Sequence, residues 1–229
     1  MADKPSRGLV LYGDGLARLI QTNLHGFASR ASCGFLALHE NEETRLIREF
    51  AEILDSNEPT VAERFMGMKA SIVTLGFKVF NWNELASELL KSLGFQEGKT
   101  LETSMFDLIF VHILVNKLVG DLLHVALSES EVGSRLHMSV IMSYGAIVEN
   151  GSEFSGVFPR QSYTMKGGNV RNYCPMLLAQ YQSAVTRMDT VESFSYRDFF
   201  ENGGNLVIPA DRFLHEVAFK LWKAPKYGA

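Results

Sequence analysis

The sequence is poor in the residues that define several specialised classes of protein. Its 229 residues include only two cysteines, Cys33 and Cys174, which are far apart and lack metal-ligand spacing. We therefore expect two small core side chains, and neither a disulfide framework nor a zinc site. No apolar run is long enough to span a bilayer, and residues 1–8 lack the apolar stretch of a signal peptide. The expectation is a cytoplasmic protein without membrane contact.

Long stretches of one charge are also missing. The 22 basic and 26 acidic residues give a formal net charge of -4 at pH 7, and no run of like charge is long. The electrostatic footprint of a nucleic-acid-binding protein is therefore lacking. Partners must be recognised at a local site, and the candidates are a small anionic metabolite and a protein.

What is present is the composition of an ordinary globular chain. Hydrophobic residues make up 46% and charged residues 21%, which is enough to fill one core. No internal repeat or linker interrupts the sequence, so we expect a single domain over residues 1–229.

Short apolar runs alternate with helical patterns along the chain. Four runs predict strands that are buried on both faces of a sheet, at residues 8–12, 70–75, 107–113 and 138–142. Apolar stripes at helical spacing lie between and after them, at residues 46–54, 85–93, 118–126 and 213–222. This order predicts an α/β fold with a mostly parallel central sheet covered by helices on both faces. The glycine-rich residues 149–171 indicate loops or a short hairpin.

Details of two helices follow from the same patterns. Glu49 and Glu52 are assigned to a solvated face, opposite the apolar stripe that contains Phe50. Asn83 is the expected N-cap of the helix at residues 85–93, and Gly94 is expected to end it.

Polar residues follow the apolar runs, and ligands of parallel sheets gather where strands end. Asp14 stands between two glycines after the first run, Lys117 and Asp121 follow the third, and Ser143 and Tyr144 follow the fourth. Asp14 either caps the next helix or belongs to a retained polar site.

Three segments in the first half of the chain are similar to motifs of a known family. Residues 22–36 (TNLHGFASRASCGFL), 68–74 (MKASIVT) and 106–112 (FDLIFVH) resemble T-P-N-L-D-x-L-A-x-x-G-x-x-G-L, G-L-K-A-A-V-I-S and Y-D-F-V-F-V-H. These motifs belong to the archaeal-type cofactor-independent phosphoglycerate mutases, which are members of the alkaline phosphatase superfamily.

The C-terminal part continues this resemblance in the same order. Residues 174–178 (CPMLL), 187–195 (RMDTVESFS), 203–206 (GGNL) and 226–229 (KYGA) resemble V-P-x-L-I, R-x-D-x-V-x-x-F-x-E, G-G-L and K-F-G-A. The family is longer, and between residues 38 and 64 this chain has only a short helical connection. The resemblance thus implies an alkaline-phosphatase-like core without the inserted domain and the nucleophile segment.

The resemblance also implies that most of the family's site residues are lost. The family transfers a phosphoryl group through a serine nucleophile with two divalent cations. No serine of this chain stands in the nucleophile's context. The first metal ligand is retained as Asp14, and the others fall on Lys117, Asp121, Tyr144, Gly145 and near Asn169. One ligand cannot hold two metals, so we expect no metal and no cofactor. We predict that the Lys117 ammonium lies beside the Asp14 carboxylate, with Asp121 as a second partner.

These departures favour a non-catalytic relative of the mutases that acts as a binding or interaction protein. The alternative is an enzyme of mutase or phosphatase type that acts on a small phosphorylated or carboxylated metabolite. Its acid and base groups would be Asp14, Lys117 and Tyr144 in a remodelled site. A third hypothesis is an intact mutase whose ligands are other residues. The candidate ligand-binding residues are Asp14, Asn23, Lys117, Asp121, Ser143, Asn169 and Arg171.

Several other residues have both a structural and a functional interpretation. The loop at residues 166–171 could hold an anion with its amides, Lys166 and Arg171, or be a plain surface loop. His112 lies in an apolar run and is expected to be a satisfied core histidine. The remaining histidines are expected at the surface: His25, His39, His124, His137 and His215. The pair at residues 199–200 and the stripe at residues 213–222 are expected to pack in the core, with a partner surface as the alternative.

Overall fold

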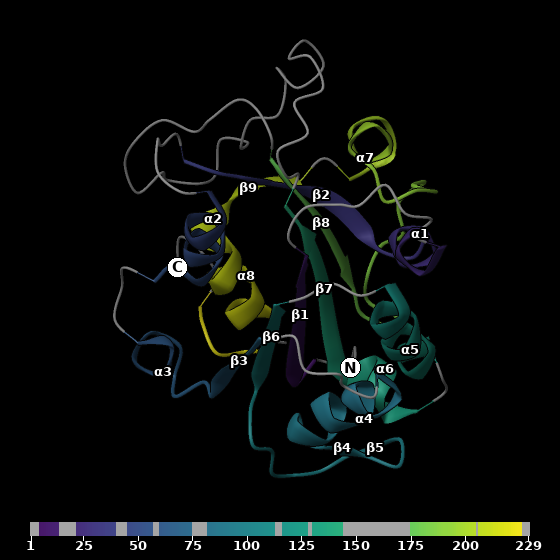
Figure 1. Ribbon diagram of the computed structural model, residues 1–229. Coiled ribbons are helices and arrows are strands. Elements are labelled where there is room, and N and C mark those ends of the chain that lie inside the picture. Colours follow the sequence, from purple (N-terminus) through teal and green to yellow (C-terminus); the bar gives the residue numbers. More distant parts are fainter. Residues whose placement is uncertain are drawn as a thin grey trace.

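A central sheet of seven strands organises the computed structural model of the chain (Figure 1). The structure describes residues 5–13, 22–39, 45–56, 60–74, 82–112, 116–127, 130–143, 175–204 and 206–225. The strand order is β3-β6-β1-β7-β8-β2-β9. In chain order these strands are β1 (Arg7–Gly13), β2 (Ser32–Ala37), β3 (Ala70–Thr74), β6 (Leu108–His112), β7 (Leu136–Met142), β8 (Met176–Tyr181) and β9 (Leu206–Pro209).

The strand directions confirm the predicted mostly parallel sheet. The β1 strand pairs in parallel with β6 and β7, β3 with β6, and β2 with β9. Only β8 runs against its neighbours β7 and β2 within the described sheet. The carboxyl ends of β3, β6, β1, β7, β2 and β9 therefore meet at one edge of the sheet.

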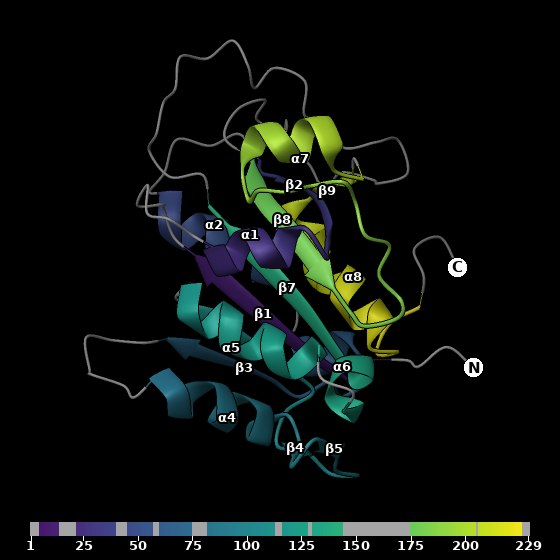
Figure 2. The same cartoon turned by 90° about the vertical axis from the view of Figure 1, so that its right-hand side faces the viewer.

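Helices cover both faces of this sheet, as the sequence predicts (Figures 1 and 2). One face carries α1 (Thr22–Ala28), α4 (Trp82–Ser92), α5 (Asn116–Leu127), α6 (Glu131–Arg135) and α7 (Tyr196–Asn202). The other carries α2 (Arg45–Leu54) and α8 (Phe213–Lys220). The remaining short elements are α3 (Val61–Arg64), the 3-10 turn η1 (Ala210–Arg212) and a small hairpin of β4 (Phe95–Gln96) and β5 (Lys99–Thr100). Among the described helices, none combines the length and the apolar character needed to cross a membrane.

Alternate residues of β1 enter two separate cores, because successive side chains of a strand point to opposite faces. Leu9 and Leu11 pack with the helices α1, α4 and α5. Val10 and Tyr12 pack with α2 and α8. Burial on both faces explains why this strand reads as a continuous apolar run in the sequence.

The sequence predicted four of the seven strands, with ends within two residues of those observed. It did not predict β2, β8 and β9. The β9 strand has only four residues, and β2 (SCGFLA) mixes small residues with two large apolar ones. Neither segment presents the uninterrupted run of large or branched apolar residues that identified the central strands.

The structure tests the caps predicted for the two ends of α4. Gly94 follows α4 with a φ of +81°, which confirms that a glycine ends this helix. Asn83 lies inside α4, which begins at Trp82, so the predicted N-cap is wrong. The predicted loops at residues 149–171 lie outside the described residues.

The predicted core role of the C-terminal aromatics is correct for only some of them. Phe199 and Phe213 are fully buried, whereas Phe200, Phe219 and Trp222 are exposed. Cys33 is buried as predicted, and burial raises the pKa of its thiol. Cys174 lies outside the described residues.

Candidate functional site

The carboxyl edge of the parallel strands brings several predicted site residues into one region. Ser143 directly follows β7, and its amide donates a hydrogen bond to the Gly13 carbonyl at 2.9 Å. Asn23 belongs to α1, and Lys117 and Asp121 belong to α5, which follows β6. The predicted residues Asp14, Tyr144, Asn169 and Arg171 lie outside the described residues.

Asn23 joins α1 to α5. Its side-chain amide donates to the Asn116 carbonyl at 2.9 Å, and the Asn116 side-chain oxygen accepts from the amides of Asn23 and Leu24, both at 3.1 Å. A Cβ atom on Gly120 would lie 2.4 Å from Asn23 Nδ2, so this close approach requires glycine. Asn116 thus satisfies first-turn amides of α1 from another helix. These hydrogen bonds of Asn23 therefore join α1 to α5, and they involve neither Lys117 nor Asp121.

Lys117 and Asp121 form an ion pair on the first turns of α5. Lys117 Nζ lies 2.8 Å from Asp121 Oδ2, and the two side chains are 52% and 36% exposed. An ion pair with this exposure adds little stability. The pairing of Lys117 with Asp121 agrees with the sequence analysis. The proximity of Lys117 to Asp14 stays a prediction, because Asp14 lies outside the described residues.

Ser143 is held by a buried carboxylate that the sequence analysis placed in solvent. The Ser143 hydroxyl donates a short hydrogen bond to Glu49 Oε2 of α2. Ser143 is 0% exposed and Glu49 is 4% exposed. The predicted solvated face of α2 is therefore wrong at Glu49. The overlooked signal is spacing: Glu49 stands four residues before the buried Ile53, which puts both on one side of the helix.

A second carboxylate of α2 holds the end of β2. Glu52 Oε2 accepts the His39 backbone amide at 3.1 Å and lies 3.3 Å from His39 Nδ1. The two side chains are only 17% and 13% exposed. Glu52, like Glu49, faces inward, and His39 is not the surface histidine that the sequence analysis expected.

Phe50 packs between the ends of β1 and β6. Its ring stacks on His112 with centroids 5.2 Å apart, and it lies 5.2 Å from the Tyr12 ring and 6.5 Å from the Phe110 ring. His112 is half-buried in this aromatic group, which fits the expected packing role. The Phe50 side chain of α2 thus covers the carboxyl ends of β1 and β6.

The other histidines correct the expectation that all of them lie at the surface. His124 is exposed, but His25 is half-buried, and its Nδ1 accepts the Phe194 amide at 3.0 Å. His215 is also half-buried. His137 is 2% exposed in β7, where Ser139 Oγ and Gln180 Nε2 lie 3.4 and 3.3 Å from its Nε2. Burial and the nearby positive charge of Lys220 lower the pKa of His137 to about 3, so this ring is neutral at pH 7.

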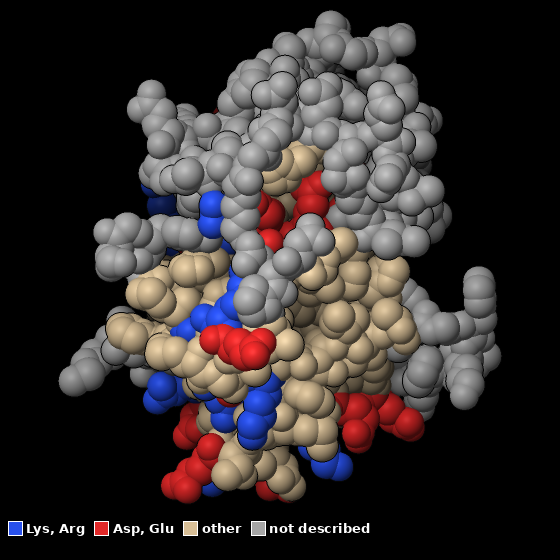
Figure 3. Space-filling view, turned by 90° about the vertical axis from the view of Figure 1, so that its left-hand side faces the viewer, with Lys and Arg blue, Asp and Glu red and all other residues tan. Residues whose placement is uncertain are grey.

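Two further features bear on a candidate site: possible metal-ligand groups, and the charge on one face of the molecule. Within the described ranges, no group of three or more His, Cys, Asp or Glu side chains could hold a metal ion. On the face that carries α2 and α3, acidic and basic side chains are interspersed (Figure 3). Figure 3 also shows a small group of acidic side chains together in the upper part of this face.

Comparisons with known proteins give a distant structural likeness. No protein-family model matches the chain, and no curated protein matches it either. A cofactor-independent phosphoglycerate mutase from Thermoplasma acidophilum is similar in structure, with 13% identity and a TM-score of 0.40 over 72% of this chain and 40% of that one. The PH0037 protein from Pyrococcus horikoshii has 16% identity and a TM-score of 0.36, over 71% and 44% of the two chains. The matched regions cover less than half of each of these longer proteins. Likeness at this level says nothing about activity.

Proposed function

We propose that this chain is a non-catalytic relative of the cofactor-independent phosphoglycerate mutases and acts as a binding or interaction protein. The observation that carries the proposal is the packing of α2 on the carboxyl edge of the sheet. Glu49 binds Ser143, and Phe50 lies against Tyr12 and His112. The candidate polar side chains that the structure describes, Asn23, Lys117, Asp121 and Ser143, are all hydrogen-bonded within the chain.

The residues of α5 support the same proposal. The sequence resemblance aligns Lys117 and Asp121 with metal ligands of the mutases. Lys117 is a cation, and its ammonium lies 2.8 Å from the Asp121 carboxylate. A lysine at a ligand position repels a divalent ion, and the paired carboxylate is already neutralised. The pair therefore favours a site that holds no divalent metal.

Manganese binding tests this proposal on the purified chain. Isothermal titration with Mn²⁺ is expected to give no stoichiometric binding for the wild type, and Asp14→Asn is expected to give the same trace. Lys117→Asp restores a carboxylate at the aligned ligand position and serves as the matched comparison. Stoichiometric binding to the wild type that Asp14→Asn abolishes would show that a metal site survives.

A second candidate function is an enzyme with a remodelled site around Asp14, and the buried pair of Glu49 and Ser143 favours it. Glu49 of α2 is a carboxylate with 4% exposure, bonded to the Ser143 hydroxyl after β7, and a carboxylate beside a hydroxyl can serve as an acid or base. Release of phosphate from p-nitrophenyl phosphate, lost in Glu49→Gln and kept in Glu63→Gln, would support this candidate. Glu63 is a suitable control because it is exposed and caps α3 away from the sheet edge.

A further inference from the structure

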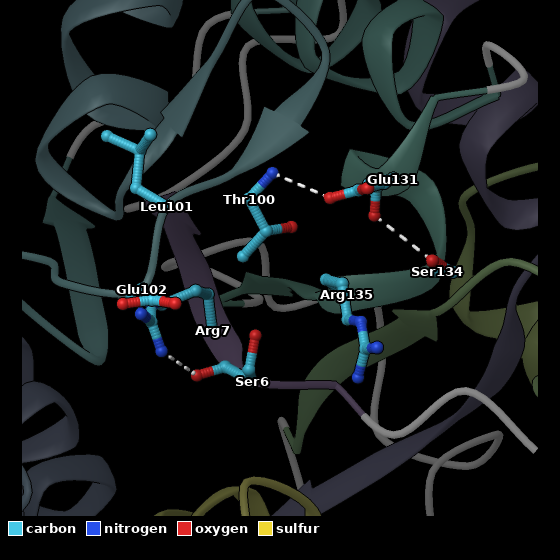
Figure 4. A pocket seen from close by; sticks show the side chains of 8 residues that line it. All are labelled: Ser6, Arg7, Thr100, Leu101, Glu102, Glu131, Ser134 and Arg135. Carbon is cyan, nitrogen blue, oxygen red and sulfur yellow. Dashed lines mark hydrogen bonds between the residues drawn. The ribbon is translucent and has the colours of Figure 1, made fainter.

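A pocket at the opposite edge of the sheet forms a separate polar site. It has a volume of about 510 Å³, within the range of small-molecule sites. Its lining comes from the start of β1, from the end of the β4 and β5 hairpin and from α6 (Figure 4). The lining side chains are Ser6, Arg7, Thr100, Leu101, Glu102, Glu131, Ser134 and Arg135. It involves no residue of the carboxyl edge.

Two hydroxyl groups of this pocket have no hydrogen-bond partner among the described residues. Ser6 Oγ and Thr100 Oγ1 are both buried, and neither bonds to any residue that the structure describes. Buried polar groups are nearly always hydrogen-bonded, so an unpaired one needs an explanation. In the view of Figure 4, the Ser6 hydroxyl oxygen lies between the side chains of Arg7 and Arg135, and the Thr100 hydroxyl oxygen lies above them. Two unpaired hydroxyls in one pocket indicate that a bound molecule supplies their partners.

Arg7 provides a fixed cation in the wall of the pocket. It is 9% exposed, its Nε donates to the Leu93 carbonyl at 2.7 Å and its Nη1 donates to the Ser6 carbonyl at 2.8 Å. Nη1 also lies 3.8 Å from Asp107 Oδ1. These contacts hold the guanidinium in one orientation, while Nη2 has no hydrogen bond to a described residue. A guanidinium fixed in this way suits a carboxylate or another oxyanion.

The pocket also offers negative charge. Glu131 accepts the Thr100 amide at 2.8 Å, so one of its oxygens is already used. Glu102 is exposed at the mouth of the pocket and forms no ion pair with a described residue. Two arginines and two glutamates balance, which disfavours a ligand that carries only negative charge. A small molecule with one carboxylate and one ammonium group matches both signs.

We propose that this pocket binds a free α-amino acid. The ligand carboxylate contacts Arg7 and the hydroxyls of Ser6 and Thr100, and its ammonium group contacts Glu102. The hydroxyls can donate to the carboxylate, which gives a partner to the two buried groups that have none among the described residues. This assignment stands independently of the function proposed for the carboxyl edge.

A thermal-shift screen of the full chain with the twenty protein L-amino acids tests the proposal. At least one amino acid is expected to raise the Tm in a saturable way, because a ligand that binds only the native state stabilises it. Propionate and ethylamine, which carry the two charges of alanine on separate molecules, are expected to give no comparable shift. No saturable shift with any amino acid would overturn the proposal, and so would an equal shift with propionate alone.

Two variants locate the binding. Thr100→Val removes only the unpaired hydroxyl, and Glu102→Gln removes only the exposed charge, so both are expected to fold with the wild-type Tm. Each is expected to weaken binding by about tenfold, the effect of losing one hydrogen bond or ion contact to a charged ligand group. Thr103→Val and Glu97→Gln, which change exposed residues outside this pocket, are the matched controls and are expected to bind normally. Unchanged affinity in both pocket variants would contradict the assignment.

Discussion

The two edges of the central sheet use their polar side chains in opposite ways. At the carboxyl edge, Ser143 is bonded to Glu49 and Lys117 to Asp121, so the polar groups satisfy one another. At the amino ends of the parallel strands, Ser6 and Thr100 line a pocket, and their hydroxyl oxygens are buried without hydrogen-bond partners among the described residues. The comparison teaches that a polar residue at the expected end of a strand does not by itself indicate a ligand site. What matters is whether its hydrogen bonds are already made.

Removal of the Phe50 ring should lower the stability of the protein most, because this ring packs against Tyr12, Phe110 and His112 at the carboxyl edge. Phe50→Ala is expected to lower the free energy of unfolding by about 3 kcal/mol, near the lower end for loss of a packed phenylalanine. Urea denaturation measures this change. The control Phe200→Ala, at a ring that is 47% exposed, should cost clearly less. Equal losses would mean that Phe50 does not close this edge.

Acid should destabilise the protein through His137 in β7. Burial lowers the pKa of His137 from its usual value of 6.5 to about 3 in the folded chain, so the unfolded state binds more protons below pH 6.5. The stability contributed by the neutral ring is therefore present above pH 6.5 and falls as the pH falls. From pH 6.5 to 5 the loss is about 2 kcal/mol, at up to about 1.4 kcal/mol per unit.

Urea denaturation across this pH range, on the wild type and on His137→Gln, isolates this contribution. The variant has no group that titrates at residue 137, so its stability should fall less between pH 6.5 and 5. Parallel pH profiles for the two proteins would contradict the assignment of a buried neutral ring.

Loss of the Ser143 hydroxyl is expected to have the next largest effect on the free energy of unfolding. Ser143→Ala leaves the Glu49 carboxylate buried without this donor, which is expected to cost about 1.5 kcal/mol, as for a hydrogen bond to a charged group. Chemical denaturation gives the value. Ser29→Ala, which removes a hydroxyl bonded to the Gly26 carbonyl at 3.1 Å, is the control and should cost less. If Ser143→Ala were neutral, the carboxyl edge would not depend on its internal pairing.

The exposed pair on α5 should contribute least. Lys117→Ala is expected to change the free energy of unfolding by no more than about 0.5 kcal/mol, since exposed ion pairs are weak. The same substitution at Arg197, which forms an exposed pair with Glu201 at 3.0 Å, is the matched comparison. A loss for Lys117→Ala well beyond that of Arg197→Ala would indicate a further partner, and Asp14 is the partner that the sequence predicts.

The central strands could be predicted because burial on both faces leaves a strong sequence signal. Residues 8–12 and 107–113 are continuous apolar runs, and they became β1 and β6. The β8 strand runs antiparallel beside β7 and β2, and strand direction depends on the chain path, which composition does not reveal.

The candidate site was harder to predict, because internal pairing depends on contacts between distant residues. Glu49 is charged, and its bond to Ser143, 94 positions away, helps to explain why it can be buried. His137 lies just before the apolar run at residues 138–142, and its burial follows because β7 begins at Leu136. The pocket at the amino edge left no pattern in the sequence, since its lining residues come from three separated segments.

Turnover of 3-phosphoglycerate in the presence of Mn²⁺ tests the central claim most directly. The account predicts no conversion to 2-phosphoglycerate by the wild type, by Asp14→Asn or by Glu49→Gln, with an active mutase as the positive control. Conversion by the wild type that is lost in Asp14→Asn would contradict it, because the carboxyl edge would then still support metal-dependent phosphoryl transfer.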